Sequence, residues 1–126
     1  MKIFVTGASG LVGKSLIRLL VRENHEVLGL VRNDQDAKSL KTLNAIPVKG
    51  DLTTIKEYDE ILKEVDVVVH SGAMVRFVGK FDEFFQINVN GTKKLLDSSI
   101  KAGVKKFIYI SAAAVALDGN PLHNIK

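Results

Sequence analysis

Short apolar runs alternate with longer amphipathic stretches along almost the whole chain. The runs are rich in valine and isoleucine, which is typical of strands, whereas the longer stretches repeat apolar residues with the period of a helix. Strands alternating with helices predict a parallel sheet joined by crossover helices. We expect strands near 2–6, 26–31, 46–49, 65–69 and 106–110, and helices near 11–22, 35–43, 54–63 and 81–102.

The apolar positions also predict which surfaces are buried. The runs 67–69 and 107–110 are apolar without alternation, which indicates central strands covered on both faces. Two of the expected helices carry an apolar stripe that should pack on the sheet. The stripe consists of Val12, Leu16, Leu19 and Leu20 in the first helix, and of Phe81, Phe85, Val89, Leu96 and Ile100 in the last.

Three glycines follow the first strand, and an amphipathic helix begins at once. Gly7 lets the chain turn off the strand, Gly10 removes the Cβ that would keep the backbone from a phosphate, and Gly13 lets the helix pack close to the sheet. Because the first N–H groups of a helix are unpaired, this turn suits the pyrophosphate of a dinucleotide. We expect that group over residues 7–12, with contacts from Thr6, Gly7, Ser9, Gly10, Leu11, Val12 and Gly13.

The glycine turn and the strand–helix alternation together predict the fold class. We expect an α/β fold with a doubly wound parallel sheet in three α/β/α layers and strand order 3-2-1-4-5. The chain has 126 residues, of which 46% are hydrophobic and 25% charged, which is enough to bury a core. Residues 1–126 therefore correspond to one nucleotide-binding domain.

A second phosphate-binding interpretation uses the same segment. Gly13-Lys14-Ser15 ends like a P-loop, whose lysine and hydroxyl serve phosphates and Mg²⁺. The first glycine of that motif should fall at position 8, which is Ala8, and the later strand 65–69 leads into His70 rather than an aspartate. A P-loop NTPase stays open as an alternative, but its motif matches the spacing of these residues less well than a dinucleotide-binding turn does.

In an open parallel sheet, ligands bind beyond the carboxyl ends of the strands. After the second strand stands Arg32, where an NAD site usually places a carboxylate for the ribose hydroxyls. A guanidinium suits a 2′-phosphate, so Arg32 favours NADP. Asp34 and Asp36 are possible ribose partners that keep NAD open.

The ends of the third and fourth strands carry further candidates. Asp51, followed by Leu52, can accept a hydrogen bond from the adenine amino group, or can cap the next helix through Thr53 or Thr54. After the fourth strand, small residues would let the backbone approach the diphosphate and the nicotinamide ribose. They are Ser71, Gly72 and Ala73, and we assign no acid–base role to the neighbouring His70.

The charge and the cysteine content indicate which kinds of partner and which cellular compartment to expect. The net charge is +4, with lysines spread along the chain rather than clustered, which argues against nucleic acid as a partner. The chain contains no cysteine, and its first strand begins at once, without an apolar leader or a membrane-spanning run. These features predict a cytoplasmic protein without a thiolate metal site, whose partner is a small molecule rather than a membrane.

Five motifs occur in order and carry a family resemblance. Together they resemble the N-terminal half of an extended short-chain dehydrogenase/reductase, the NAD-dependent epimerase/dehydratase group. The run 111–115 with Val31-Arg32 is similar to the dihydroflavonol-4-reductase-like branch. The motifs are Thr6-Gly7-x-x-Gly10-x-x-Gly13, Gly50-Asp51-Leu52, His70-x-x-Ala73, Asn88-Val89-x-Gly91-Thr92 and Tyr109-Ile110-Ser111.

The resemblance implies a Rossmann fold, an NADP or NAD cofactor, and hydride transfer between the nicotinamide and a carbonyl or alcohol of a small substrate. It also implies that Asn88 and Thr92, on the long helix, tie that helix to the central strands. Family members often form homodimers through this helix. A non-catalytic dinucleotide-binding protein is the second alternative.

The catalytic part of the resemblance is incomplete. Family chemistry uses a Tyr-x-x-x-Lys pair, in which the lysine lowers the tyrosine pKa for proton exchange with the substrate. The tyrosines here, Tyr58 and Tyr109, lack a lysine four residues later. The family's catalytic hydroxyl falls on Ala112, which leaves its neighbour Ser111 as the catalytic candidate. We expect the 126-residue chain alone to be catalytically incomplete.

Overall fold

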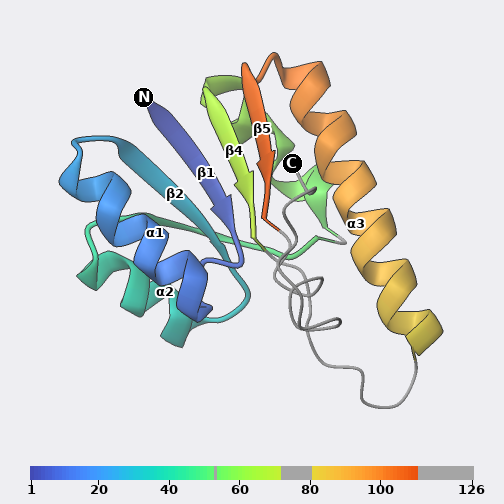
Figure 1. Cartoon of the computed structure of the whole chain (residues 1–126), viewed down its shortest axis with the longest axis horizontal. Helices are drawn as coiled ribbons and strands as arrows, with labels where there is room; N and C mark the ends of the chain where they lie inside the picture. Colours follow the sequence, from blue (N-terminus) through green and yellow to red (C-terminus); the bar gives the residue numbers. More distant parts are fainter. Residues whose placement is uncertain (53, 72–80, 111–126) are drawn as a thin grey trace, which may run out of the picture.

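The structure, a computed structural model, describes residues 1–52, 54–71 and 81–110, with only the backbone described for 81–88. Five strands of this part form one parallel sheet in the order β3-β2-β1-β4-β5 (Figure 1). The predicted fold class and strand order are confirmed. The strands are β1 (Lys2–Thr6), β2 (Glu26–Val31), β3 (Ile46–Lys49), β4 (Val67–His70) and β5 (Lys106–Tyr109).

Helices cover both faces of the sheet, which gives the three layers of a Rossmann-type fold. Helices α1 (Leu11–Arg22) and α2 (Asp34–Thr42) lie on one face. Helix α3 (Phe81–Ala102) lies on the other, with the 3-10 helices η1 (Ile55–Glu57) and η2 (Asp59–Glu64).

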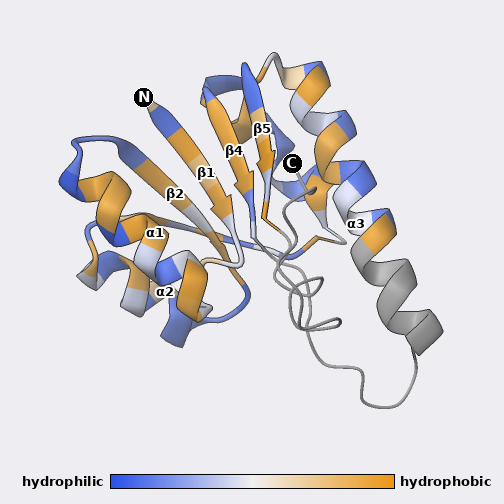
Figure 2. Ribbon diagram, viewed as in Figure 1, coloured by the Kyte–Doolittle hydropathy of each residue, from blue (hydrophilic) through white to orange (hydrophobic). Residues whose placement is uncertain are grey.

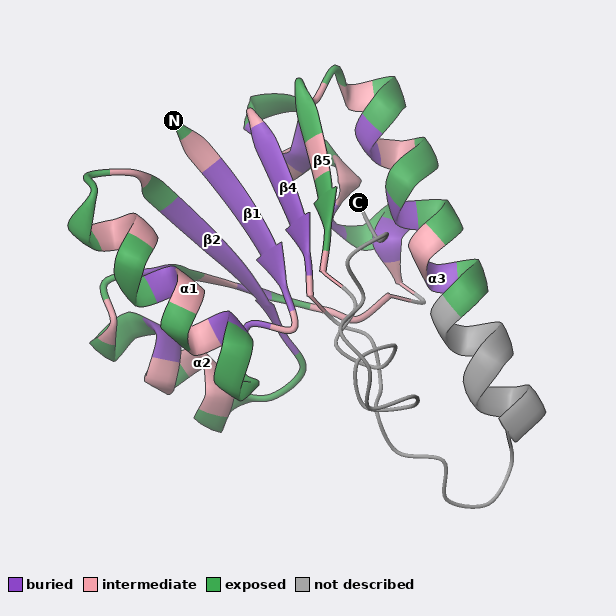
Figure 3. Ribbon diagram, viewed as in Figure 1, coloured by how far each residue is buried: buried purple, intermediate pink, exposed green. Residues whose placement is uncertain are grey.

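Alternate residues of the inner strands enter two separate cores. In β1, Ile3 and Val5 join the core under α1 and α2, whereas Phe4 joins the core under α3. Strands β1 and β4 are mostly hydrophobic in Figure 2 and buried in Figure 3. This burial on both faces is what a central parallel strand requires, and it is confirmed for β4, whose residues are all buried.

Strand β5 differs from the prediction. It lies at the edge of the sheet, and Ile108 and Tyr109 are 41% and 50% exposed. An apolar run does not distinguish an edge strand from a central one, because that difference depends on which strands pair. The expectation that both runs form fully covered strands is therefore wrong for β5 within the described residues.

The helix expected near 54–63 is also different, since it forms η1 and η2 rather than one α-helix. Tyr58 separates the two with φ −133°, far from helical values. Its ring is buried against Phe4 and its hydroxyl donates to the Asp51 carbonyl oxygen, so the side chain holds the backbone out of the helix.

Strand β4 begins two residues later than expected and includes His70. Asp66 precedes the strand and accepts a hydrogen bond from the Lys2 N–H through its side chain. The ladder with β1 then starts at Val67, opposite Ile3, and ends at His70, opposite Thr6. His70 is consequently a strand residue with a buried side chain.

Over the described side chains, the buried face of α3 differs from the predicted stripe, whose Phe81 and Phe85 side chains lie outside the described part. Val89, Leu96 and Ile100 are 45%, 38% and 67% exposed, and the helix instead buries Gly91, Leu95 and Ser99. At Gly91 the helix passes close to the loop after β3, where there is no space for a side chain. A Cβ at Gly91 would lie 2.8 Å from the Leu52 Cβ.

The stripe on α1 is correct only in part. Leu16 and Leu20 pack against the core, whereas Val12 and Leu19 are 47% and 51% exposed. The fully buried position is Ile17, together with Gly13. Within the described ranges, no helix is both long and apolar enough to cross a lipid bilayer.

Candidate functional site

The turn between β1 and α1 has the geometry of an anion cradle. Gly7 has φ 65°, in the left-handed region that glycine adopts without strain. The Gly10 N–H donates to the Gly7 carbonyl oxygen at 3.1 Å, which closes the turn. Gly10 is the N-cap of α1 and has no side chain to accept from the first helical N–H groups. That helix end therefore offers N–H groups and a partial positive charge to an anion.

The three glycines are required for different reasons. Gly7 is required by its backbone angle, and a Cβ at Gly13 would overlap the Gly7 carbonyl oxygen. Gly10 has ordinary extended angles, φ −79° and ψ 171°, which any residue adopts. Among the described residues, a Cβ at Gly10 would meet only the Gly7 oxygen, at 3.4 Å. The described protein therefore needs no glycine at position 10, and the free space there faces outward.

The glycine turn packs against β2. Ala8 is fully buried, and a Cβ at Gly29 would lie 2.8 Å from the Ala8 Cβ and 2.6 Å from the Leu40 Cδ1. Gly29 thus lets the turn settle directly on the sheet. The neighbouring predicted contacts Ser9, Leu11 and Val12 are exposed, with Leu11 at 85%.

The P-loop alternative is wrong for this turn. Helix α1 begins at Leu11, so Gly13, Lys14 and Ser15 lie inside the helix rather than at its opening. Gly13 is packed against the Gly7 carbonyl group, so it serves the contact of the helix with the turn.

A chain of hydrogen bonds joins the ends of β1 and β4 to α3. The Ser71 N–H donates to Thr6 Oγ1 at 3.0 Å, and Thr6 Oγ1 lies 2.6 Å from His70 Nδ1. On the other side of the ring, His70 Nε2 lies 2.8 Å from Thr92 Oγ1. Thr6 and His70 are each 1% exposed, so the Thr6 side chain acts within the protein rather than as a surface contact.

His70 has a threonine hydroxyl at each ring nitrogen. Thr6 Oγ1 accepts from the Ser71 N–H and lies next to Nδ1, and Thr92 Oγ1 lies next to Nε2, so one nitrogen of the neutral ring donates and the other accepts. Burial lowers the pKa of His70 to about 4. The ring also stacks on Tyr109 at 5.2 Å. His70 is neutral at pH 7 and both its nitrogens are engaged within the protein.

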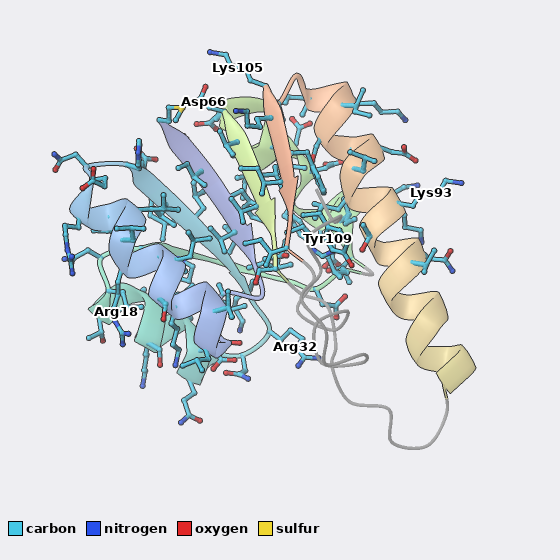
Figure 4. All side chains as sticks on the ribbon, viewed as in Figure 1. Arg18, Arg32, Asp66, Lys93, Lys105 and Tyr109 are labelled. Carbon is cyan, nitrogen blue, oxygen red and sulfur yellow. The ribbon has the colours of Figure 1, made fainter. Side chains whose placement is uncertain are left out.

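Beyond β2, the charges are arranged around the start of α2. Asn33 caps this helix by accepting from the Asp36 N–H at 2.8 Å. Lys49 Nζ lies 2.7 Å from Asp34 Oδ1, and this bond lowers the pKa of Asp34. Arg32 is exposed just past the strand (Figure 4). Arg32 and the N-terminus of α2 thus lie next to Asp34, whose carboxylate is already paired with Lys49.

The loop after β3 is held by its own following residues. The Asp51 N–H donates to Thr54 Oγ1 at 3.0 Å, and the Asp51 carbonyl oxygen accepts from the Tyr58 hydroxyl at 3.0 Å. The Gly50 N–H donates to the Val31 carbonyl oxygen, which ties this loop to the end of β2. Asp51 and Leu52 are half-buried at the same edge of the sheet as the glycine turn.

Several predicted site residues lie outside the described part. They are Thr53, Gly72, Ala73 and Ser111, together with the side chain of Asn88, whose backbone belongs to α3. The sequence analysis missed the contributions of Gly29, Lys49 and Tyr58. Only Lys49 had a usable signal, since the order 3-2-1 places the end of the third strand next to Arg32, and Lys49 is registered with Val31.

Comparison with known proteins agrees with this geometry. A ketoreductase from Stigmatella aurantiaca, 4-hydroxy-2-methyl-3-oxo-4-farnesyl-3,4-dihydroquinoline-1-oxide ketoreductase, is 36% identical over 97% of this chain and 36% of its own length. A 3-beta-hydroxysteroid dehydrogenase from Mycolicibacterium neoaurum is 29% identical over 98% of this chain and 35% of its own length. The chain thus spans about a third of these curated relatives.

Solved structures share the same fold. A short-chain dehydrogenase/reductase superfamily protein from Agrobacterium tumefaciens, with bound NAD, matches with a TM-score of 0.77 and 28% identity over 97% of this chain and 36% of that one. A yeast methylglyoxal/isovaleraldehyde reductase complexed with NADPH matches with a TM-score of 0.78 at 23% identity, over 91% of this chain and 38% of that one, and shows the likeness of fold.

The family model for the 3-beta hydroxysteroid dehydrogenase/isomerase family matches residues 4–126. This match includes the end of β1, the glycine turn, the other four strands and the loops at the carboxyl ends. The chain therefore belongs to the 3-beta hydroxysteroid dehydrogenase/isomerase family, within the extended short-chain dehydrogenase/reductase group that its ordered motifs predicted.

Proposed function

We propose that this chain binds NADP or NAD as the cofactor domain of an oxidoreductase or epimerase. The observation that carries the proposal is Gly10, the one glycine of the turn that the described protein does not itself need. A missing Cβ on the open side of an anion cradle is what a close approach by a pyrophosphate requires. The bound nicotinamide would supply or accept the hydride for a carbonyl or alcohol of a small molecule.

In this proposal, the residues at different strand ends bind different parts of the cofactor. The turn at 7–12 binds the pyrophosphate through main-chain N–H groups, and Arg32 lies beside the adenosine ribose. Asp51 and Leu52 contact the adenine. On the nicotinamide side, the cofactor is held by Ser71, Gly72, Ala73 and Asn88, and Ser111 is the catalytic candidate.

A preference for NADP is the finer part of the proposal. An NAD site needs a carboxylate that can accept from the ribose hydroxyls. Asp34 is already paired with Lys49, which offsets part of its repulsion of a phosphate. Arg32 then supplies a guanidinium for the 2′-phosphate, whereas Asp36, in the first turn of α2, is the carboxylate that an NAD site would use instead.

The test is titration of the purified chain with NADPH, NADH and ATP–Mg²⁺, followed by the fluorescence of the reduced nicotinamide and by calorimetry for the nucleotide. We expect saturable NADPH binding, weaker NADH binding, and no competition by ATP–Mg²⁺ at equal concentration. Failure to bind either nicotinamide cofactor would contradict the proposal, and equal affinity for both would contradict only the NADP preference.

A further inference from the structure

We propose that Tyr58 and Thr54 are positioning residues for the adenine of the cofactor, because they hold the main chain of Asp51 in place before the cofactor binds. This inference rests on the proposed function and adds to it a specific device for recognising the base. We call Tyr58, Thr54 and the main chain of Asp51 the Asp51 clamp.

The clamp holds both polar atoms of the Asp51 main chain. The Thr54 hydroxyl accepts from the Asp51 N–H at 3.0 Å and lies 3.2 Å from the Asp51 carbonyl oxygen, to which it can donate. The Tyr58 hydroxyl donates to the same carbonyl oxygen at 3.0 Å, and so does the Thr54 N–H at 3.1 Å. The main chain of Asp51, which we propose to lie next to the adenine, is therefore hydrogen-bonded as fully as a residue of a helix or strand, although it belongs to a loop.

Tyr58 is itself anchored in the centre of the molecule. It is 3% exposed, and its ring stacks on Phe4 with 5.8 Å between the ring centroids and an interplanar angle of 27°. Phe4 is fully buried in β1, the strand that leads into the glycine turn. Burial raises the pKa of Tyr58, as does the neighbouring charge of Asp51, so the phenol stays protonated and remains a donor. The loop that carries Asp51 and the glycine turn are therefore both fixed to β1, the loop through the stacking of Tyr58 on Phe4 and the turn as the continuation of the strand.

The adjoining residue is held from the opposite side. Leu52 lies against α3 at Gly91, where a Cβ would come within 2.8 Å of the Leu52 Cβ. Asp51 is therefore held from the side of η1 and its neighbour Leu52 from the side of α3. Holding a binding loop in its bound position removes the ordering cost from the binding step, which is the origin of affinity gained by preorganisation.

The base contact depends on direction as well as distance. A carboxylate at Asp51 accepts from the adenine 6-amino group, whereas the 6-carbonyl of hypoxanthine presents an acceptor to it and would be rejected. Discrimination between the two bases needs the Asp51 side chain in one place. Loosening its main chain should therefore reduce the preference for adenine more than it reduces the affinity for the shared parts of the cofactor.

Two variants remove the clamp with little change of shape. Tyr58→Phe keeps the ring and its stacking on Phe4 and removes only the hydroxyl, and Thr54→Val removes the hydroxyl that serves both Asp51 atoms. Thr54→Ser keeps that hydroxyl and is the conservative counterpart. Ser99→Ala is the matched control, because it deletes a buried hydroxyl that donates to a main-chain carbonyl oxygen, that of Leu95, within α3.

The experiment measures the Kd of NADPH and of its hypoxanthine analogue for the parent and each variant, by nicotinamide fluorescence, after thermal melts confirm folding. We expect the parent to prefer NADPH by roughly tenfold or more, as a charge-assisted hydrogen bond predicts. Tyr58→Phe and Thr54→Val should reduce this ratio by roughly threefold or more, whereas Thr54→Ser and Ser99→Ala should retain it.

The outcomes separate the two proposals. A parent that binds neither nucleotide refutes the proposed function and this inference with it. A parent that binds NADPH but does not distinguish the analogue, or clamp variants that keep the parental ratio, refute the inference and leave the proposed function standing. Equal weakening of both nucleotides by Tyr58→Phe would likewise refute it, since that result is a general loss of stability or shape.

Discussion

Single residues at the glycine turn separate what the fold requires from what a ligand requires. Gly7 and Gly13 are explained by a backbone angle and by a packing contact, whereas Gly10 is explained by neither among the described residues. Their substitutions should therefore have different consequences, although the three glycines belong to one motif.

Replacing Gly10 and Gly13 in turn tests this division. Gly10→Val should abolish detectable NADPH binding, because the side chain occupies the phosphate position, and should cost only about 1 kcal/mol of stability, because valine is a poorer N-cap of α1 than glycine. Gly13→Ala should cost about 1–3 kcal/mol of stability, because its methyl group overlaps the Gly7 carbonyl group. Fluorescence titration and thermal melts give both readouts. A Gly10→Val protein with parental NADPH affinity would show that the glycine is structural.

Arg32 tests cofactor choice at the same scale. Arg32→Ala should weaken NADPH by about 1.5–3 kcal/mol, roughly 10- to 100-fold in Kd, with a much smaller effect on NADH, which lacks the 2′-phosphate. Arg18→Ala is the matched control, since this exposed arginine lies on α1 away from the strand ends (Figure 4). Equal losses for both cofactors would mean that Arg32 contacts the adenosine without reading the phosphate.

At the scale of elements, the main surprise is the face that α3 presents to the sheet. The described members of the predicted stripe, Val89, Leu96 and Ile100, are exposed, and the described part of the helix packs through Gly91, Leu95 and Ser99. Leu95→Ala should cost about 2–5 kcal/mol, whereas the adjacent Leu96→Ala should cost about 1 kcal/mol or less. Urea unfolding of the two variants checks this assignment. Similar losses from both substitutions would place the helix in a different rotation.

The junction of β1, β4 and α3 makes stability depend on pH through His70. Its folded pKa, about 4, lies below its ordinary value of 6.5, so the folded state favours the neutral ring. The stabilisation is complete above about pH 6.5 and is lost as the pH falls toward 4, because the unfolded chain takes up the proton first. The loss should reach about 2 kcal/mol near pH 4.5.

Urea unfolding between pH 7 and pH 4.5 measures this effect. His70→Gln should be less stable at pH 7 and should show a flatter curve in that window, since it cannot take up the proton. The carboxylates with lowered pKa values, such as Asp34 and Asp66, add their own losses at lower pH and remain in the variant. A parental slope in His70→Gln would contradict the role of His70.

For the whole molecule, binding and catalysis should separate. The 126-residue chain should bind NADPH yet give no appreciable oxidation of it with simple carbonyl substrates, because it has no Tyr-x-x-x-Lys pair and has Ala112 at the catalytic hydroxyl position. Absorbance of NADPH with time measures turnover, and NADPH titration of the same sample confirms that the site is formed. Robust turnover would point to Ser111 as a catalytic group.

The order of elements and the glycine turn could be predicted from the sequence because both follow from neighbouring residues. The periodicity of apolar residues predicts strands and helices, and a parallel alternation with a turn of this type allows few strand orders. The candidate residues Arg32, Asp51 and Ser71 followed in turn, since the carboxyl ends of parallel strands lie at one edge.

What only the tertiary structure decided depends on distances across the fold. Among the described residues, strand β5 is exposed because it lies at the edge of the sheet, and α3 buries Gly91 because Leu52 leaves no space for a side chain there. The pairing of Lys49 with Asp34 and the contact of Tyr58 with Asp51 likewise join residues whose spacing carries no motif. The sequence by itself determined the order of the elements and the place of the candidate site, whereas packing between elements decided which faces are buried and which side chains hold that site in position.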